Sequence, residues 1–337
     1  MNVLVVGGTG FVGTHLCREL AERGHHVTAL SRDPDEADLP PEVDRVAGDV
    51  TAYDSIEGAF EGQDAVVFLV SLSPLFKPSG GYDRHYDVHL GGTENAVRAA
   101  KAHGVDRYVQ MSALGADPDA DTAFIAAKGE ADRVVRESGL DWTVFQPSVI
   151  FGEGDEFVGF TKLVAPPYFT PLPGGGKSKF QPIWIGDLVE MFAVALEGTL
   201  PQEEGEAEER EEGAAVTPAL RRVEEDADEP ANPHVGRTYE IGGPDVLTLA
   251  EVARLAHAAD GKPVNVYPVP MALTGVGLKL LDSIPGAPLG ADQYRSLQFD
   301  NVAEDNDVGT FGFEEGDLTT LASYLGVDPA AAEPGRA

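Results

Sequence analysis

The chain has 337 residues, of which 42% are hydrophobic, and it carries 57 acidic against 24 basic residues for a formal net charge of −33. This length and hydrophobic content allow a sizeable core, built as one large domain or as a main domain with a smaller companion. The single cysteine, Cys17, excludes an internal disulfide and a cysteine-based zinc site, and the negative charge argues against nucleic acid as a partner.

The first twenty residues read as a strand, a glycine-rich turn and a helix. The apolar run VLVV leads into Gly7-x-x-Gly10-x-x-Gly13, and a helical pattern follows. Gly7 permits a tight turn, Gly10 lets the backbone approach a pyrophosphate, and Gly13 lets the helix pack closely on the strand. The helix N-terminus would offer its unpaired N–H groups to the phosphates. In this context the glycine triplet indicates a dinucleotide-binding site rather than a structural turn alone.

The end of the second strand bears on the choice of dinucleotide. An acidic residue there would accept a hydrogen bond from the adenosine ribose 2′-hydroxyl of NAD(H). The sequence instead reads ALSRDP, so Ser31 and Arg32 offer donors that suit the 2′-phosphate of NADP(H). Asp33 and Asp35 follow closely, which keeps NAD(H) possible.

Strand-like apolar runs alternate with amphipathic helical segments through about residue 150. Such alternation predicts an α/β fold with a Rossmann-type doubly wound parallel sheet. A further strand leads to Asp49 and Val50, an acid and an apolar neighbour that would flank an adenine ring rather than only close a turn. The clearest runs are residues 2–7, 25–31, 64–70, 106–112 and 141–152.

The pattern changes after residue 150 and divides the chain. Residues 1–150 are expected to form the dinucleotide-binding domain, and 151–200 with 236–330 a smaller C-terminal cap or substrate region with returning Rossmann elements, including a helix within 185–198. Residues 201–235 carry twelve acids against three arginines and almost no aromatic residue. That composition predicts a disordered acidic insertion, because it buries too little apolar surface to order itself.

The stretch DTAFIAAKGEAD places a lysine on the apolar face of a helix. Phe124, Lys128, Ala131 and Val135 recur at the spacing that stacks side chains on one face. A lysine there needs a polar partner, so a snorkelling surface lysine is the less favoured interpretation.

Together these motifs resemble the extended short-chain dehydrogenase/reductase superfamily. The shared pattern is the glycine turn, then GDV, MSALGA, a helical lysine, and DWTVFQPSVIFG. The resemblance implies a catalytic serine at Ser112 and a lysine at Lys128 that contacts the nicotinamide ribose. The family's tyrosine, four residues before the lysine, is replaced by Phe124. Because phenylalanine has no proton to exchange, the resemblance implies impaired tyrosine-dependent catalysis.

The C-terminal half is similar to one branch of this superfamily, the atypical proteins typified by the nucleotide-binding accessory subunit of respiratory complex I. The most distinctive segment is P-x-x-x-DQ-x-x-x-L-x-x-DNV, residues 288–302. This resemblance implies an NADP(H)-binding structural protein with a respiratory-complex or quinone-related partner. The alternatives are an NADP-dependent reductase, dehydratase or epimerase whose proton comes from Ser112, His89 or a cap residue, and a nucleotide-dependent redox sensor.

Two further features favour ordinary roles. His85 and His89 lie four residues apart, but no third ligand pattern accompanies them, so no metal is expected and His89 is aligned with the family's active-site asparagine. Residues 271–286 form an apolar helical pattern without a basic face, which favours packing on the cap over a membrane or a partner subunit.

The expected cofactor is NADP(H), with NAD(H) possible. No signal peptide or membrane span is recognisable, so a cytoplasmic location is expected, with peripheral contact at the inner face of the cell membrane left open. Acidic residues spread along the chain and only eight lysines suggest a halophilic source. The residues expected to line the cofactor site are Gly7, Thr9, Gly10, Phe11, Val12, Gly13, Arg32, Asp49, Val50, Leu69, Ser112, Lys128, Pro147 and Val149.

Overall fold

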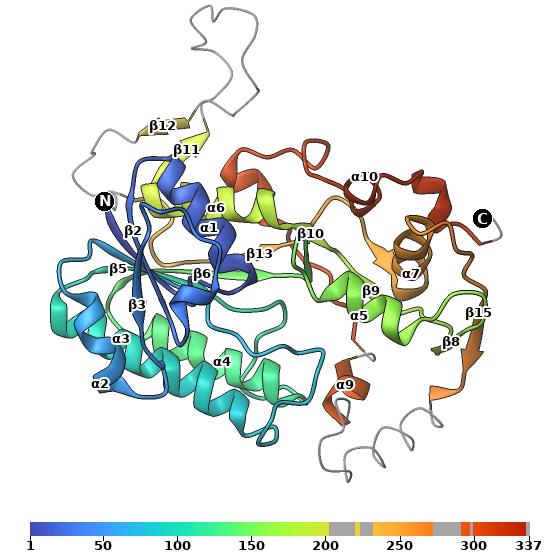
Figure 1. Ribbon diagram of the computed structural model, residues 1–337, viewed down its shortest axis with the longest axis horizontal. Coiled ribbons are helices and arrows are strands. Elements are labelled where there is room, and N and C mark those ends of the chain that lie inside the picture. The colour runs from blue at the N-terminus through green and yellow to red at the C-terminus, as the bar shows by residue number, and fades with distance from the viewer. Residues whose placement is uncertain (202–219, 223–231, 272–290, 297–298, 335–337) are drawn as a thin grey trace, which may run out of the picture.

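A seven-stranded parallel sheet forms the centre of the protein (Figure 1). The computed structural model describes residues 1–201, 220–222, 232–271, 291–296 and 299–334. The strands lie in the order β13-β6-β5-β4-β1-β2-β3. The chain adds β2 and β3 on one side of β1 and then crosses over to add β4 on the other side, so the topological switch point lies between β1 and β4. A ligand cleft is expected there, at the carboxyl ends of the strands. The strands are β1 (Asn2–Val6), β2 (His26–Ser31), β3 (Asp44–Ala47), β4 (Ala65–Phe68), β5 (Arg107–Met111), β6 (Asp141–Pro147) and β13 (Arg237–Ile241).

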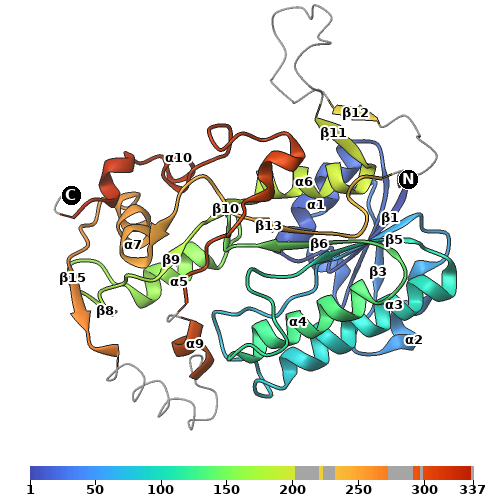
Figure 2. The same cartoon turned by 180° about the vertical axis from the view of Figure 1, so that it is seen from behind.

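Helices cover both faces of the sheet, as the two views in Figures 1 and 2 show. One face carries α1 (Phe11–Glu22) and α6 (Ile185–Glu197), and the other carries α2 (Tyr53–Ile56), α3 (Gly91–His103) and α4 (Ala123–Arg136). Each face has its own buried cluster of aliphatic and aromatic side chains. The doubly wound Rossmann-type fold is therefore confirmed, as is the helix expected within 185–198.

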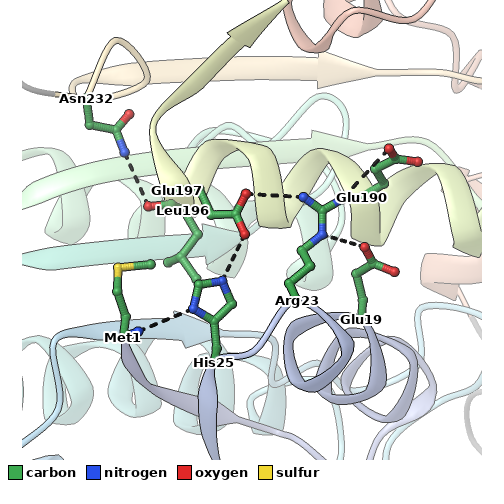
Figure 3. Close-up of polar contacts among 8 residues, drawn as sticks. All are labelled: Met1, Glu19, Arg23, His25, Glu190, Leu196, Glu197 and Asn232. Atoms are coloured by element: carbon green, nitrogen blue, oxygen red, sulfur yellow. Dashed lines mark hydrogen bonds and ion pairs between the residues drawn. The ribbon is translucent and has the colours of Figure 1, made fainter. Parts of the chain in front are cut away.

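A charged cluster joins α1 to α6 at the edge of one helical layer (Figure 3). Arg23 Nε donates to Glu19 Oε1 at 2.5 Å, and its other nitrogens lie 3.2 Å from Glu197 and 3.8 Å from Glu190. His25 lies 2.9 Å from Glu197 on its other side. One guanidinium thus offsets part of the repulsion among three carboxylates that face one another across the two helices.

The cap lies beside the carboxyl ends of the strands and is built from short elements (Figure 1). Its aliphatic and aromatic side chains form two small clusters around α7. The elements are β7 (Ile150–Phe151), α5 (Phe157–Val164), β8 (Thr170–Pro173), β9 (Lys179–Phe180), β10 (Ile183–Trp184), β14 (Leu247–Thr248), α7 (Leu249–Ala258), β15 (Val266–Val269), α9 (Ala291–Ser296) and α10 (Leu321–Leu325). Single helical turns complete the fold at η1 (Pro34–Glu36), η2 (Glu57–Phe60), η3 (Tyr86–Leu90), η4 (Asp307–Phe311) and η5 (Pro329–Ala332).

Only part of the predicted acidic insertion, 201–235, is described. Within it β12 (Leu220–Arg222) pairs antiparallel with β11 (Thr199–Pro201), and Asn232 Nδ2 donates to the Ala195 carbonyl at 2.8 Å. Residues 202–219 and 223–231 lie outside the described residues, and disorder there remains a prediction. Residues 272–286 of the predicted apolar segment also lie outside the described residues, and their packing on the cap remains a prediction. Among the helices that are described, none has the length and apolarity needed to cross a bilayer.

Candidate functional site

A cleft of about 1740 Å³ runs along the carboxyl ends of the central strands, and its wall includes cap residues such as Phe157 and Phe180. Every residue expected to line a cofactor site borders this cleft except Lys128, which lies buried behind its wall. Those that border it are Gly7, Thr9, Gly10, Phe11, Val12, Gly13, Arg32, Asp49, Val50, Leu69, Ser112, Pro147 and Val149.

The glycine turn at the start of the chain leaves space where a phosphate would approach. Gly7 has a φ of +90°, in the left-handed region that favours glycine. A Cβ on Gly13 would lie 2.2 Å from the Gly7 carbonyl oxygen, and one on Gly8 would lie 2.6 Å from the Ala29 Cβ. A Cβ on Gly10 would meet only one atom within 4 Å, so its outer side is open. The turn fits a pyrophosphate above Gly10. Gly8 must also be a glycine because a Cβ there would clash with Ala29, and the sequence motif did not mark this position.

Two arginines border the end of the cleft near β2 and β3. Asp49 accepts hydrogen bonds from the Thr51 N–H at 2.9 Å and the Thr51 hydroxyl at 2.8 Å, and these lower its pKa. The positive charges of Arg32 and Arg84 lower the pKa of Asp49 further, and Arg84 itself pairs with Asp87 at 3.3 Å. Arg84 was missed in the sequence because no motif surrounds it, and Asp33 borders the same region.

Lys128 has the polar partners that its place on an apolar helix face requires. Its side chain is 1% exposed, and Nζ donates to the Met111 carbonyl at 3.0 Å and to the Val70 carbonyl at 3.5 Å. Burial lowers the pKa of Lys128 to about 8, although the charge of Asp132 partly opposes this. An ammonium has three N–H donors, and the two carbonyls use two of them.

Ser112 forms a hydrogen bond that directs its proton away from the cleft. Its hydroxyl donates to Asp132 Oδ2 at 2.8 Å, and Gln146 Nε2 donates to the same oxygen at 2.9 Å. Asp132 is fully buried, and burial raises its pKa against the opposing effect of these two hydrogen bonds. Since the one hydroxyl proton is used, Ser112 presents its lone pairs to the cleft.

Phe124 borders the cleft and covers two buried histidines. Its ring is edge-on to His85 and His89, with centroids 5.6 Å and 5.3 Å away. His89 Nε2 accepts the Leu72 N–H at 2.9 Å, so its other nitrogen carries the proton in the neutral ring. Burial lowers the pKa of both histidines, that of His89 most.

Within the described ranges no group of three or more His, Cys, Asp or Glu is placed to hold a metal ion.

Comparisons with known proteins agree with this geometry. A family model described as NAD(P)H-binding matches residues 7–161. The 2-alkyl-3-oxoalkanoate reductase of Stenotrophomonas maltophilia is 31% identical over 285 residues, covering 78% of this chain and 77% of the reductase. The chain belongs to the extended short-chain dehydrogenase/reductase superfamily.

One further relative and one solved structure are similar to this short-chain dehydrogenase/reductase. The mitochondrial NADH dehydrogenase (ubiquinone) 1 alpha subcomplex subunit 9 of Arabidopsis thaliana is 25% identical over 90% of this chain and 71% of the plant protein. A nucleoside-diphosphate-sugar epimerase from Staphylococcus aureus shares the fold, with a TM-score of 0.66, 20% identity, and coverage of 96% of this chain and 99% of the epimerase chain. The atypical branch expected from the sequence is thus supported.

The distinctive C-terminal segment of this short-chain dehydrogenase/reductase braces the site from the cap. Asp292 Oδ2 accepts the Ala123 N–H at 2.9 Å, at the start of the helix that carries Phe124 and Lys128. Asn301 Oδ1 accepts the Ser148 hydroxyl at 2.6 Å and the Val149 N–H at 3.1 Å, in the loop after β6. The DQ and DN pairs of the sequence motif therefore attach the cap to the two segments that border the cleft.

Proposed function

We propose that this protein binds NADP(H) in the cleft and serves as the nucleotide-binding component of a respiratory or quinone-linked assembly, with little tyrosine-dependent redox activity. The observation that carries the proposal is Phe124, which stands four residues before buried Lys128 and packs against neutral histidines. The ring supplies no proton at the position where the superfamily uses a tyrosine. A missing general acid removes roughly 10²–10⁴-fold in rate.

The preference for NADP(H) rests on the arginines at the adenosine end of the cleft. Arg32 follows β2, where NAD-dependent relatives would need a carboxylate, and Arg84 approaches the same region. Two guanidinium groups suit the 2′-phosphate because each is a fixed multiple donor. The carboxylate of Asp33 would weaken but not cancel this preference.

The partner follows from the plant relative, whose name assigns it to an NADH dehydrogenase with ubiquinone as acceptor. The likeness extends over most of both chains and includes the cap, which suggests that the cap contributes to association as well as to the site. A redox sensor would bind the nucleotide in the same cleft. It would differ from a structural component only because nucleotide binding would change its affinity for the partner.

An NADP-dependent carbonyl reductase is the second candidate, favoured by the Ser112–Asp132 contact. Burial raises the pKa of Asp132, which is the direction that a proton-holding group requires. With Asp132 protonated, its O–H would donate to the Ser112 oxygen and leave the Ser112 proton free to face the cleft. A carbonyl carbon would then receive hydride from the bound dinucleotide, Ser112 would give its proton to the carbonyl oxygen, and the Asp132 proton would replace it. His89 is a poorer donor, since it is buried behind Phe124 and already accepts a backbone N–H.

Calorimetry and turnover assays in high salt test these proposals. The wild type should bind NADPH more tightly than NADH, and Arg32→Ala should reduce that preference while Arg18→Ala, on the outer surface, should not. With NADPH and a panel of ketones, aldehydes and quinones, the wild type should show no turnover, and Phe124→Tyr should gain weak activity.

Three results would overturn or redirect the proposal. Equal affinity for the two nucleotides would remove the arginines from their role. Robust wild-type turnover would refute the scaffold function, and its loss in Asp132→Asn with binding retained would establish the reductase. Nucleotide-dependent capture of a defined partner would favour the sensor.

A further inference from the structure

Two segments of the cap differ in charge from the rest of this acidic chain. Residues 157–186 and 261–271 contain no Asp or Glu, whereas the whole chain carries 57 such residues in 337. At that frequency a stretch of thirty residues would hold about five acids, so their absence marks a distinct surface composition. The same two segments hold four of the chain's eight lysines, which are Lys162, Lys177, Lys179 and Lys262.

These segments also expose large hydrophobic side chains. Leu163 is 68% exposed, Tyr168 62%, Phe169 60% and Tyr267 49%. The Phe169 and Tyr267 rings lie with centroids 4.6 Å apart, one from the residue before β8 and the other from β15. Figure 1 shows β8 and β15 at the end of the cap that is far from β3. We call Leu163, Tyr168, Phe169 and Tyr267 the cap-tip surface.

The backbone keeps one of these aromatic residues turned outward at a conformational cost. Tyr168 has a φ of 67°, the single positive value among non-glycine residues in the described part of the chain. Its N–H donates to the Pro263 carbonyl at 2.7 Å, and Asn265 Nδ2 donates to its carbonyl at 2.9 Å. A bulky residue in the left-handed region is strained, so these two hydrogen bonds hold a conformation that a glycine would adopt more easily.

Cationic groups outnumber the acids beside the cap-tip surface. Lys162 and Lys262 share one carboxylate, Asp260, at 3.1 Å and 3.6 Å. This leaves a net positive charge next to Leu163 and Tyr168. Lys177 is exposed on the connection that follows β8. Exposed aromatic rings together with an excess of lysines over acids are the composition that favours the interface of an anionic bilayer.

We propose that the cap-tip surface docks on the headgroup layer of an anionic phospholipid bilayer. The rings and Leu163 would enter the boundary between headgroups and acyl chains, and Lys162 and Lys262 would lie among the phosphates. The remaining acidic surface would be repelled, so contact would occur through the cap tip alone. At high salt the attraction between the lysines and the phosphates is screened, and insertion of the apolar side chains provides most of the binding free energy. This inference is independent of which nucleotide the cleft holds.

Vesicle flotation of the full-length protein tests the proposal. Vesicles of phosphatidylglycerol mixed with phosphatidylcholine would be compared with pure phosphatidylcholine at two KCl concentrations. The wild type should float with the anionic vesicles, more strongly at the lower salt. Phe169→Ser with Tyr267→Ser should weaken binding by roughly tenfold or more, because two half-exposed rings no longer insert. Tyr324→Ser, a change to an exposed tyrosine on α10, should bind like the wild type.

NADPH binding by each variant verifies that its fold is intact, since the cap tip is remote from the glycine turn. Failure of the wild type to float, or equal flotation of the double variant, would overturn the proposal. Light scattering that shows a dimer abolished by the double variant, without vesicles, would assign the surface to a second copy of the chain instead. Capture of an acidic protein through the same residues, with no lipid binding, would likewise overturn it.

Discussion

Replacement of Lys128 by methionine tests two effects of this residue separately: its effect on the free energy of unfolding and its contribution to nucleotide binding. Its ammonium is buried and its pKa is about 8, against an ordinary value of 10.5. A shift of this size corresponds to about 3 kcal/mol of destabilisation at pH 7. Methionine removes that cost, but it leaves the two carbonyl partners without a donor, which costs about 1–3 kcal/mol. Lys128→Met should therefore be as stable as the wild type at pH 7, or more stable by about 2 kcal/mol.

The pH dependence gives the sharper measurement. Between pH 8 and 10.5 the unfolded chain keeps the Lys128 proton that the folded chain has released, so folding stability rises with pH in this window. From pH 7 to 9.5 the rise attributable to Lys128 is about 2 kcal/mol. Subtracting the urea-unfolding free energies of Lys128→Met from those of the wild type, at fixed high salt, isolates this contribution from other titrating groups.

Nucleotide binding completes the comparison. Lys128→Met should bind NADPH more weakly at pH 7, because the donor proposed for the nicotinamide ribose is lost. A variant with the same pH slope of stability as the wild type would show that the ammonium is not desolvated as described. Unchanged NADPH affinity would show that the third N–H does not serve the cofactor.

Three further changes test other parts of the structure. Gly13→Ala should destabilise the protein by about 1–3 kcal/mol and weaken NADPH binding, because the new Cβ would lie 2.2 Å from a carbonyl oxygen, whereas Gly159→Ala on α5 meets nothing and should be neutral or slightly stabilising. Arg23→Ala should cost roughly 1 kcal/mol in urea unfolding, less as salt increases, while exposed Arg18→Ala should cost almost nothing. Burial raises the pKa of Asp187 to about 6, so wild-type stability should gain relative to Asp187→Asn as pH falls from 7 through 6; a constant difference across that range would contradict the burial of this carboxylate.

Sequence reasoning located the parts of the site whose positions depend only on residues close to them in the chain. The glycine motif spans seven residues, from the turn after β1 into the first turn of α1, so its spacing alone predicts its shape. Lys128 was placed on a buried face by the helical period, and its 1% exposure confirms that. Ser112 borders the cleft as expected because it directly follows β5.

The remaining contacts depend on how distant elements pack. Ser112 and Asp132 are twenty residues apart, and their hydrogen bond exists only because α4 packs beside β5 and β6. Asn301 reaches Val149 across a separation of 152 residues. The sequence marked the segment around Asn301 as distinctive, but no periodicity shows which loop it would meet. Arg84 carries no local signal at all, since an arginine in a loop is ordinary until the fold brings it to the wall of the cleft.

The last strand of the sheet has a consequence for how the chain reaches this structure. β13 pairs with β6 from Arg237 opposite Thr143 to Ile241 opposite Pro147, although residues 148–236 separate the two strands. During synthesis β6 is therefore an open sheet edge, with unpaired N–H and C=O groups, until the whole first part of the cap has emerged from the ribosome. Pairings of such high contact order form late. We expect refolding to pass through a stage in which the glycine turn is assembled while β6 remains open to mispairing with another chain.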